Sequence, residues 1–196
     1  MRVGKESGLK IQKEKGYSLL ELLVTLGIIG ILLSLLFVGF SYVQEKQNTK
    51  QALIEMAVLQ TGIISYEADF GNYPNCPEKI CTPGECLFLS MLGFHNAEGN
   101  LELPPYPTTL PVELFGFDQA KLDTAEIPEL SHNDGDSLKL WLAQTLEQDP
   151  SFLDPWGNEY QYEYPRQDDA GGYRIYSLGP DGKTGDQFSK DDLFPN

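Results

Sequence analysis

The first residues with recognisable chemistry lie near the start of the chain, where a basic segment meets a long apolar run. The basic segment ends in Gly16, and Tyr17 and Glu21 follow it. From Leu22 to Val43 no side chain is charged. At a helical rise of about 1.5 Å per residue this run is roughly 33 Å long, enough to cross the core of a bilayer. Glu21 therefore lies at the edge of a segment where a carboxylate needs a partner.

This junction resembles the prepilin N-terminus that type IV pilins and type II secretion pseudopilins share. The resemblance implies that a prepilin peptidase cuts after Gly16 and then methylates the new terminal residue, Tyr17. It also implies that Glu21 aligns subunits in a filament, because a neighbouring subunit's α-amine supplies its missing partner. One departure is Val38, which stands where many family members have a proline.

Two plainer interpretations of the same run stay open. A secretory signal peptide would be cut near Gly39, but its apolar core would be unusually long and Glu21 would be unexplained. A simple signal anchor would let Glu21 reach the membrane interface. The coincidence of glycine, aromatic residue and glutamate at this spacing favours the prepilin interpretation.

A second group of residues with metal-binding chemistry lies near the C-terminus, where acids alternate with glycines. The acids are Asp181, Asp186, Asp191 and Asp192. Hard cations such as Ca²⁺ take six to eight oxygens from carboxylates and backbone carbonyls on a flexible loop. The spacing does not match an EF-hand. A solvated acidic turn without metal is the alternative.

The sequence around these acids resembles the C-terminal sheet of the major pseudopilin of type II secretion systems. The matching stretches are DPWGN at 154–158, the tyrosines after it and YSLGPDGKTG from Tyr176. The resemblance implies a Ca²⁺ ion in the acidic loop. The ligands that it implies are the carboxylates of Asp181, Asp191 and Asp192 and the carbonyls of Leu178 and Ser189. The loop is a few residues longer than in the relatives, which leaves the role of Asp186 open.

Three cysteines, Cys76, Cys81 and Cys86, follow one another at five-residue intervals in a turn-rich segment. On the oxidising side of a membrane two of them are expected to form a disulfide, and the sequence does not assign the pair. A zinc site is the alternative, although the spacing is not C-x-x-C and the nearest histidine is His95.

No pattern typical of an enzyme is present, so we predict a structural protein. His95 and His132 stand alone in turn-like segments, where we expect them on the surface, and no nucleophile motif, phosphate loop or dinucleotide motif accompanies them. The formal net charge of −15 argues against nucleic acid as a partner, because binding a phosphate backbone requires basic surface.

The elements that must position these residues begin with one long helix. Apolar residues continue past Val43 at steps of four and three, until Gly71 to Pro74 ends the pattern. We therefore predict a helix from Tyr17 to Phe70, with a transmembrane half and an amphipathic half. The apolar face of the second half consists of Ala52, Met56, Leu59, Ile63, Tyr66 and Phe70.

The middle of the chain predicts only short elements. Glu85 to Gly93 is typical of a short buried helix, and the segment 96–150 resembles an insertion rich in proline, glycine and acids. Within it we expect a short strand at Val112 to Phe117 and a helix from Ser137 to Gln148, capped by Asp136. The apolar face of that helix consists of Leu138, Trp141, Leu142 and Leu146.

The C-terminal tyrosines predict an antiparallel hairpin. Tyr160, Tyr162 and Tyr164 alternate with polar residues, and Tyr173 to Leu178 forms the return strand. With the resemblance, this gives an α+β, pilin-like fold in which the long N-terminal helix packs on a small C-terminal antiparallel sheet. The expected domains are a leader at 1–16, a transmembrane half-helix at 17–43 and a periplasmic domain at 44–196, which includes the hairpin and acidic loop at 154–193.

The leader carries five basic and two acidic residues, which keeps the N-terminus cytoplasmic before processing and the acidic domain periplasmic. The resemblance implies a structural subunit of a type II secretion pseudopilus, a homo-oligomeric filament built from the inner membrane. Its implied partners are the prepilin peptidase, the inner-membrane assembly platform and the membrane itself. The alternatives are a type IV pilin or minor pilin and a membrane-anchored exported domain that does not polymerise.

Overall fold

The structure is a computed structural model of the 196-residue chain. It describes residues 16–75, 81–95, 105, 108, 110–130, 134–166, 168, 170–185 and 190–195, without the side chains of 36–39 and 41. The chain divides into two compact units, Met1–Gln44 and Glu45–Asn196, which are described in turn. A long helix, α1, contributes to both.

Helix α1 spans Leu19–Phe70, 52 residues, so the prediction of one continuous helix is confirmed and its start lies two residues later than expected. In the first unit the hydroxyls of Thr25 and Ser34 donate to the carbonyls of Leu22 and Ile31 at 2.9 and 2.7 Å. These polar groups are thus satisfied within the helix, and the large exposed side chains that the structure describes there are aliphatic or aromatic. Among the described residues, no helix has the length and apolarity needed to cross a membrane.

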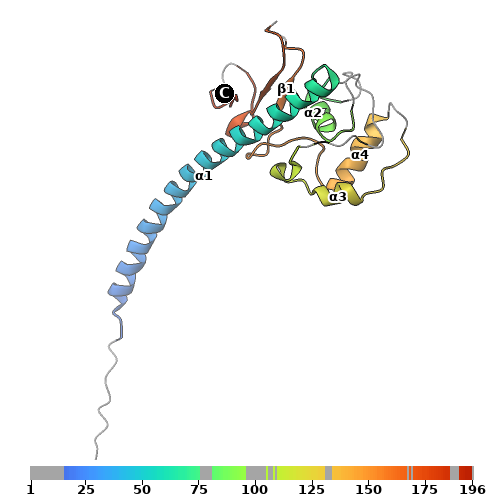
Figure 1. Ribbon diagram of the computed structural model, residues 1–196. Helices are drawn as coiled ribbons and strands as arrows, with labels where there is room; N and C mark the ends of the chain where they lie inside the picture. The colour runs from blue at the N-terminus through green and yellow to red at the C-terminus, as the bar shows by residue number, and fades with distance from the viewer. Residues whose placement is uncertain are drawn as a thin grey trace, which may run out of the picture. The chain divides into compact units, whose positions relative to one another are not determined.

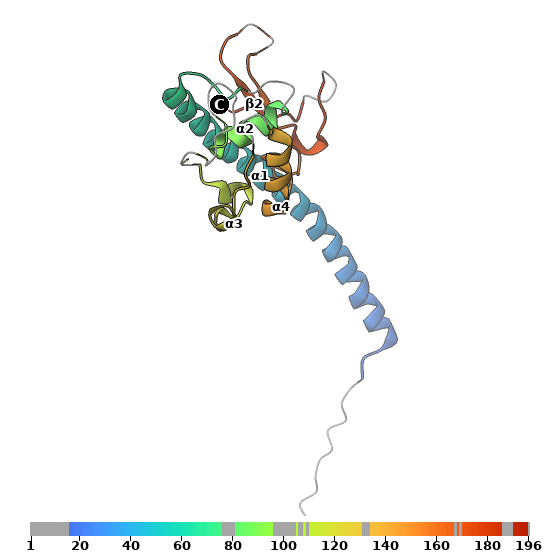
Figure 2. The ribbon, with the colours of Figure 1, turned by 90° about the vertical axis from the view of Figure 1, so that its right-hand side faces the viewer.

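In the second unit the predicted apolar face of α1 forms one wall of the core. Ala52, Met56, Leu59 and Ile63 are completely buried and Tyr66 nearly so, while Phe70 is half-buried. The spacing of these residues places them on one side of the helix, and the other elements of the unit gather against it (Figures 1 and 2).

Helix α2, Pro83–Met91, confirms the predicted short buried helix. Its start is fixed by a capping box: the Thr82 hydroxyl accepts from the Glu85 N–H at 3.2 Å, and the Glu85 carboxylate accepts from the Thr82 N–H at 2.8 Å. Phe88 carries the helix into the core, where its ring centroid lies 5.0 Å from those of both Phe117 and Phe152. The helix also packs against the first strand of the sheet.

Two predictions for the middle segment are wrong in detail. The expected strand is instead a 3-10 helix, η1, Val112–Phe115. Val112 and Phe115 are both buried, and residues three apart lie on the same side of a 3-10 helix but on opposite faces of a strand. Gly116, in a left-handed conformation, ends the helix. The predicted later helix is α4, Gly135–Leu146, and its cap is Asp134, which accepts from the Ser137 N–H at 3.2 Å. Asp136 instead pairs with Lys139 at 3.4 Å.

The predicted apolar face of α4 is confirmed, with Leu138, Leu142 and Leu146 buried and Trp141 packed against the core. A six-residue helix, α3, Gln119–Thr124, precedes α4 and packs on it (Figure 1). The segment therefore supplies part of the core.

The predicted hairpin is present and short. Strand β1, Gln161–Glu163, pairs antiparallel with β2, Arg174–Tyr176, with Tyr162 opposite Ile175. Both of these central side chains are buried, and the Tyr162 hydroxyl donates to the Pro74 carbonyl at 2.9 Å. The fold of the described residues is thus α+β, as expected for a pilin-like protein.

A buried carboxylate joins α1 to the hairpin. Glu55 is 2% exposed, although it lies on a helix whose buried face is otherwise apolar. The Tyr160 hydroxyl donates to it at 2.7 Å and the Gln51 amide at 2.8 Å. Burial raises the pKa of Glu55, and these two hydrogen bonds only partly oppose that effect. The carboxylate is therefore held at some cost to stability when it is ionised.

Replacing Glu55 with Gln tests that cost. The folded state raises the pKa of Glu55 above its ordinary value of 4.5. Protonation of Glu55 therefore stabilises the fold fully below pH 4.5, and this stabilisation is lost as the pH rises through the pKa of the folded state. Glu55→Gln stays neutral, so we expect it to gain free energy of unfolding relative to the parent between pH 4 and pH 7. Denaturant unfolding of the full chain in detergent measures the difference.

The control is Glu129→Gln, which changes an exposed carboxylate in the same unit. Its stability difference from the parent should stay nearly constant over the same pH range. A difference for Glu55→Gln that is equally flat would contradict the raised pKa.

Candidate functional site

The N-terminal residues singled out by the sequence lie at the start of α1. Gly16 and Tyr17 precede the helix and are exposed, with Tyr17 at 83%. Glu21 lies in the first turn, where its carboxylate accepts from the Ser18 N–H at 3.5 Å. A negative charge is favourable at a helix N-terminus, because the unpaired N–H groups there carry partial positive charge. In the single chain Glu21 thus already faces the end of the helix where cleavage after Gly16 would create an amine.

The acidic loop near the C-terminus begins with a short 3-10 helix, η2, Gly179–Asp181, which follows β2 after Ser177 and Leu178. The carboxylate of Asp191 accepts from the Asp181 N–H at 3.2 Å, so the two ends of the loop meet. Ser177 and Leu193 close it further, each donating its N–H to the other's carbonyl at 3.0 Å. The structure therefore places Asp181, Asp191 and Asp192, three of the expected ligands, at the meeting ends of the loop, although their carboxylates do not all lie within 4.8 Å of one another.

Asp192 carries the feature that points most directly to a cation. Its Oδ1 is buried and has no hydrogen-bond partner among the described residues. Burial raises the pKa of Asp192, and the neighbouring carboxylates of Asp191 and Asp181 raise it further. A bound cation would offset both the burial of the charge and the repulsion between the carboxylates, whereas an uncharged side chain of the loop could not.

Of the other expected ligands, Leu178 is buried and caps the start of η2. Ser189 and Asp186 lie outside the described residues. The acids present fit a hard cation that takes carboxylates and backbone carbonyls together.

The DPWGN turn braces the start of this loop, a role that the sequence did not reveal. Asp154 is buried, and its Oδ1 accepts from the N–H groups of Trp156 and Asn158 at 3.0 and 2.9 Å. Its Oδ2 accepts from the Ser177 hydroxyl at 2.6 Å, and that hydroxyl accepts from the Gly179 N–H at 3.0 Å. The Asn158 amide donates to the Gly179 carbonyl at 2.7 Å. The sequence signals this brace only through the Asp154-Pro155 pair, which is typical of a turn and stands just before the hairpin.

Gly179 is required where it stands. Its φ is +63°, and a Cβ there would overlap the backbone of Asp191. Any side chain would therefore separate the two ends of the acidic loop.

The cysteine segment lies at the start of α2, the helix that packs against β1. Cys86 is disulfide-bonded, whereas Cys81 is a buried free thiol whose pKa is raised by burial to about 12. Cys76 and His132 lie outside the described residues. The expectation that His95 lies on the surface is wrong: it is completely buried, because the turn after α2 folds it back towards that helix, and burial lowers its pKa to about 4.

Comparison with protein families gives two matches along the chain. Residues 11–37 match the family described as "Prokaryotic N-terminal methylation motif", which includes Gly16, Tyr17 and Glu21. Residues 113–194 match the family described as "Type II secretion system (T2SS), protein G". The C-terminal part of the chain is thus similar to type II secretion protein G, and its N-terminal part to the methylation motif. The protein G match covers the hairpin and the acidic loop. Because it begins at residue 113, it also covers much of the middle segment.

Curated relatives agree over most of the chain. It is 25% identical over 182 residues to "Type II secretion system core protein G" of Escherichia coli strain K12, covering 92% of this chain and 90% of the relative. The protein of the same name from Vibrio cholerae is 23% identical over 184 residues, covering 94% and 92%. That from Aeromonas hydrophila is 26% identical over 174 residues, covering 89% and 88%.

Replacing Ser177 with Ala tests the brace of the acidic loop. The change leaves Asp154 Oδ2 buried without its donor, and we expect a loss of about 1–3 kcal/mol in the free energy of unfolding. Thr124→Ala is the control, since its hydroxyl donates only to the Ala120 carbonyl on the surface of α3. Denaturant unfolding of both variants should show at most about 0.5 kcal/mol for the control. Equal losses would mean that Ser177 does not support Asp154.

Proposed function

We propose that this chain is a structural subunit of a type II secretion pseudopilus, cleaved and methylated by a prepilin peptidase and polymerised from the inner membrane. The observation that carries the proposal is the pairing of a methylation-motif match at 11–37 with a protein G match at 113–194 on one chain. The three relatives bear the name of a secretion-system core protein. No catalytic role is proposed for any residue.

The surface of α1 in the first unit supports a membrane-embedded store of subunits. The large apolar side chains that the structure describes here, at positions 19–35, 40, 42 and 43, are exposed, for example Leu22 at 54% and Ile31 at 64%. Exposed aliphatic area of this extent is costly in water. In the proposal, lipid covers it before assembly with the second unit in the periplasm, and helices of neighbouring subunits cover it in the filament.

A type IV pilin is the second candidate, since the N-terminal motif is common to both classes. The match of residues 113–194 to protein G favours the pseudopilin. Secretion of a cargo protein by a strain that depends on this subunit, without surface pili, would separate the two functions.

Processing and assembly are tested together by expressing the chain with a prepilin peptidase and a secretion assembly platform. The mature chain should begin at N-methylated Tyr17, as read by intact mass and N-terminal sequencing. Glu21→Gln should be cleaved normally but yield few filaments, because the neutral amide cannot pair with a neighbouring subunit's charged amine.

Glu45→Gln is the matched control, since it removes an exposed carboxylate farther along α1. It should be processed and assembled like the parent. A mature chain that starts at Met1 would refute the pseudopilin proposal, and full filament yield from Glu21→Gln would refute the role of that residue.

We also propose that the acidic loop binds Ca²⁺ through Asp181, Asp191 and Asp192, with the carbonyls of Leu178 and Ser189 as further ligands. It is supported by the buried Oδ1 of Asp192, which has no hydrogen-bond partner in the described part of the chain, and by the meeting of Asp181 with Asp191. A bound ion would stabilise the folded domain in proportion to its concentration, by about 2.7 kcal/mol at one hundred times the dissociation constant.

Calcium should therefore raise the melting temperature of the chelator-treated chain, and Mg²⁺ should do so much less, because it prefers a rigid octahedral site. Asp192→Asn should abolish most of the response. Asp123→Asn, an exposed acid on α3, should keep it. A parent whose melting temperature is the same in calcium and in excess chelator would exclude the site.

A further inference from the structure

A cluster of soft metal-binding donors lies away from the acidic loop. In the part of the chain that the structure describes, the one group of three metal-ligating side chains with donor atoms all within 4.8 Å of one another is Cys81, Cys86 and His95. All three residues are buried. Two sulfurs and an imidazole nitrogen are the donors that Zn²⁺ prefers, and they differ from the oxygens that Ca²⁺ takes.

The local fold explains how residues so far apart in sequence meet. Cys81 immediately precedes the capping box of α2, and Cys86 lies on its first turns. After α2 the Phe94 N–H donates back to the Leu89 carbonyl at 2.8 Å, which turns the chain towards the helix. The Tyr66 hydroxyl then donates to the His95 carbonyl at 3.3 Å and fixes this residue against α1.

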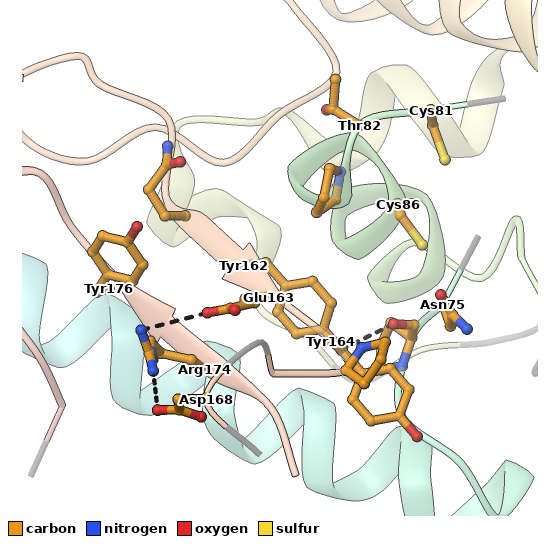
Figure 3. A pocket seen from close by; sticks show the side chains of 14 residues that line it. Asn75, Cys81, Thr82, Cys86, Tyr162, Glu163, Tyr164, Asp168, Arg174 and Tyr176 are labelled. Carbon is orange, nitrogen blue, oxygen red and sulfur yellow. Dashed lines mark hydrogen bonds and ion pairs between the residues drawn. The ribbon is translucent and has the colours of Figure 1, made fainter. Parts of the chain in front are cut away.

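The spacing of the three donors is compatible with one shared metal ion. Zinc–sulfur bonds of about 2.3 Å imply sulfur atoms about 3.8 Å apart at a tetrahedral metal, so the donors need to close by no more than about 1 Å. Side-chain rotation is enough for a movement of that size. Cys81 and Cys86 also line an open pocket together with Asn75 and Tyr162, which gives an ion a path to the sulfurs (Figure 3).

The disulfide of Cys86 determines when such a site can form, because a sulfur in a disulfide carries no thiolate charge. We propose that Cys81, Cys86 and His95 form a zinc site that takes up metal when the Cys86 disulfide is reduced. The same sulfur thus serves either a covalent cross-link or a metal.

The chemistry balances with a dithiol as reductant. The dithiol gives two electrons and two protons to the disulfide and becomes a disulfide itself, which leaves Cys86 and its former partner as thiols. Zn²⁺ then binds the sulfurs of Cys81 and Cys86 and displaces one proton from each, while His95 contributes a neutral nitrogen. A water molecule or a further donor completes the tetrahedron.

Cobalt(II) is the probe, because it occupies zinc sites and its visible and near-ultraviolet absorption reports tetrahedral geometry and thiolate ligation. The full chain in detergent is reduced with a phosphine, which becomes the phosphine oxide while water supplies the oxygen and protons. We expect one cobalt per reduced chain, with thiolate-to-cobalt charge transfer, and displacement by Zn²⁺. The oxidised chain should lack this absorption.

Cys81→Ser is the decisive variant, because it removes one ligand and leaves the disulfide of Cys86 intact. Its fold can be checked by melting in the oxidised form, and its cobalt affinity when reduced should fall by more than the roughly 10–100-fold that the loss of an outer-shell partner costs. His95→Asn should do the same, whereas His132→Asn, the same change at the chain's other histidine, should bind cobalt like the parent.

Three results would overturn the proposal. They are a reduced parent without thiolate–cobalt absorption, an oxidised parent that binds as well as the reduced one, and a folded Cys81→Ser that keeps the parent's spectrum and affinity. If His95→Asn does not fold, Cys81→Ser alone decides.

Discussion

Burial of one face of α1 is the constraint on which the second unit depends. Met56, Leu59 and Ile63 are completely covered, and α2, η1 and the hairpin contribute the side chains that cover them. Each such side chain stabilises the fold by about 1.5–3 kcal/mol relative to exposure. A two-stranded hairpin of three-residue strands is marginal in isolation, so it owes its position to this face rather than to its own ladder.

A line of polar contacts runs from that face to the acidic loop. Tyr160 bonds to Glu55 on α1, and its N–H donates to the Phe152 carbonyl at 2.9 Å, just before the DPWGN turn. Asp154 in that turn holds Ser177, and Ser177 pairs with Leu193. Through these contacts an ion in the loop would restrain the elements packed on α1. The domain's shape and its proposed calcium site are thus physically linked.

Elements that depend on periodicity and local chemistry can be predicted from the sequence. Caps, turns and buried polar residues are predicted less well, because they depend on how distant parts of the chain pack together. The buried face of α1 follows from spacing alone, and α2 from its apolar composition. The cap of α4 was misplaced because Asp134 and Asp136 both precede an apolar pattern, and only the backbone decides between them. The strand expected at Val112 to Phe117 is a 3-10 helix, because the burial of both Val112 and Phe115 depends on the packing around them, which the local sequence does not specify.

Burial of His95 could not be predicted, because it depends on the turn after α2 and on Tyr66, 29 residues earlier in the chain. The same holds for Glu55, whose position on a predicted helix says nothing of the tyrosine that meets it from the hairpin. The pairing of the cysteines is equally a property of the folded loop, since equal spacing makes all three pairs possible in sequence. A polar group in a core is recognised by its partners, and for Glu55 and His95 the decisive ones, Tyr160 and Tyr66, are distant in sequence.

The pair of hydrogen bonds between Ser177 and Leu193 makes the acidic loop a closed ring whose ends are fixed independently of its contents. Closing a ring costs conformational entropy that grows only with the logarithm of its length, so doubling the loop costs about 0.6 kcal/mol. Residues can therefore be added between Asp181 and Asp191 with little effect on the fold. This gives an evolving chain freedom to alter the loop's length, and with it the carbonyls available to the proposed ion, while the ends that carry the three acids stay fixed.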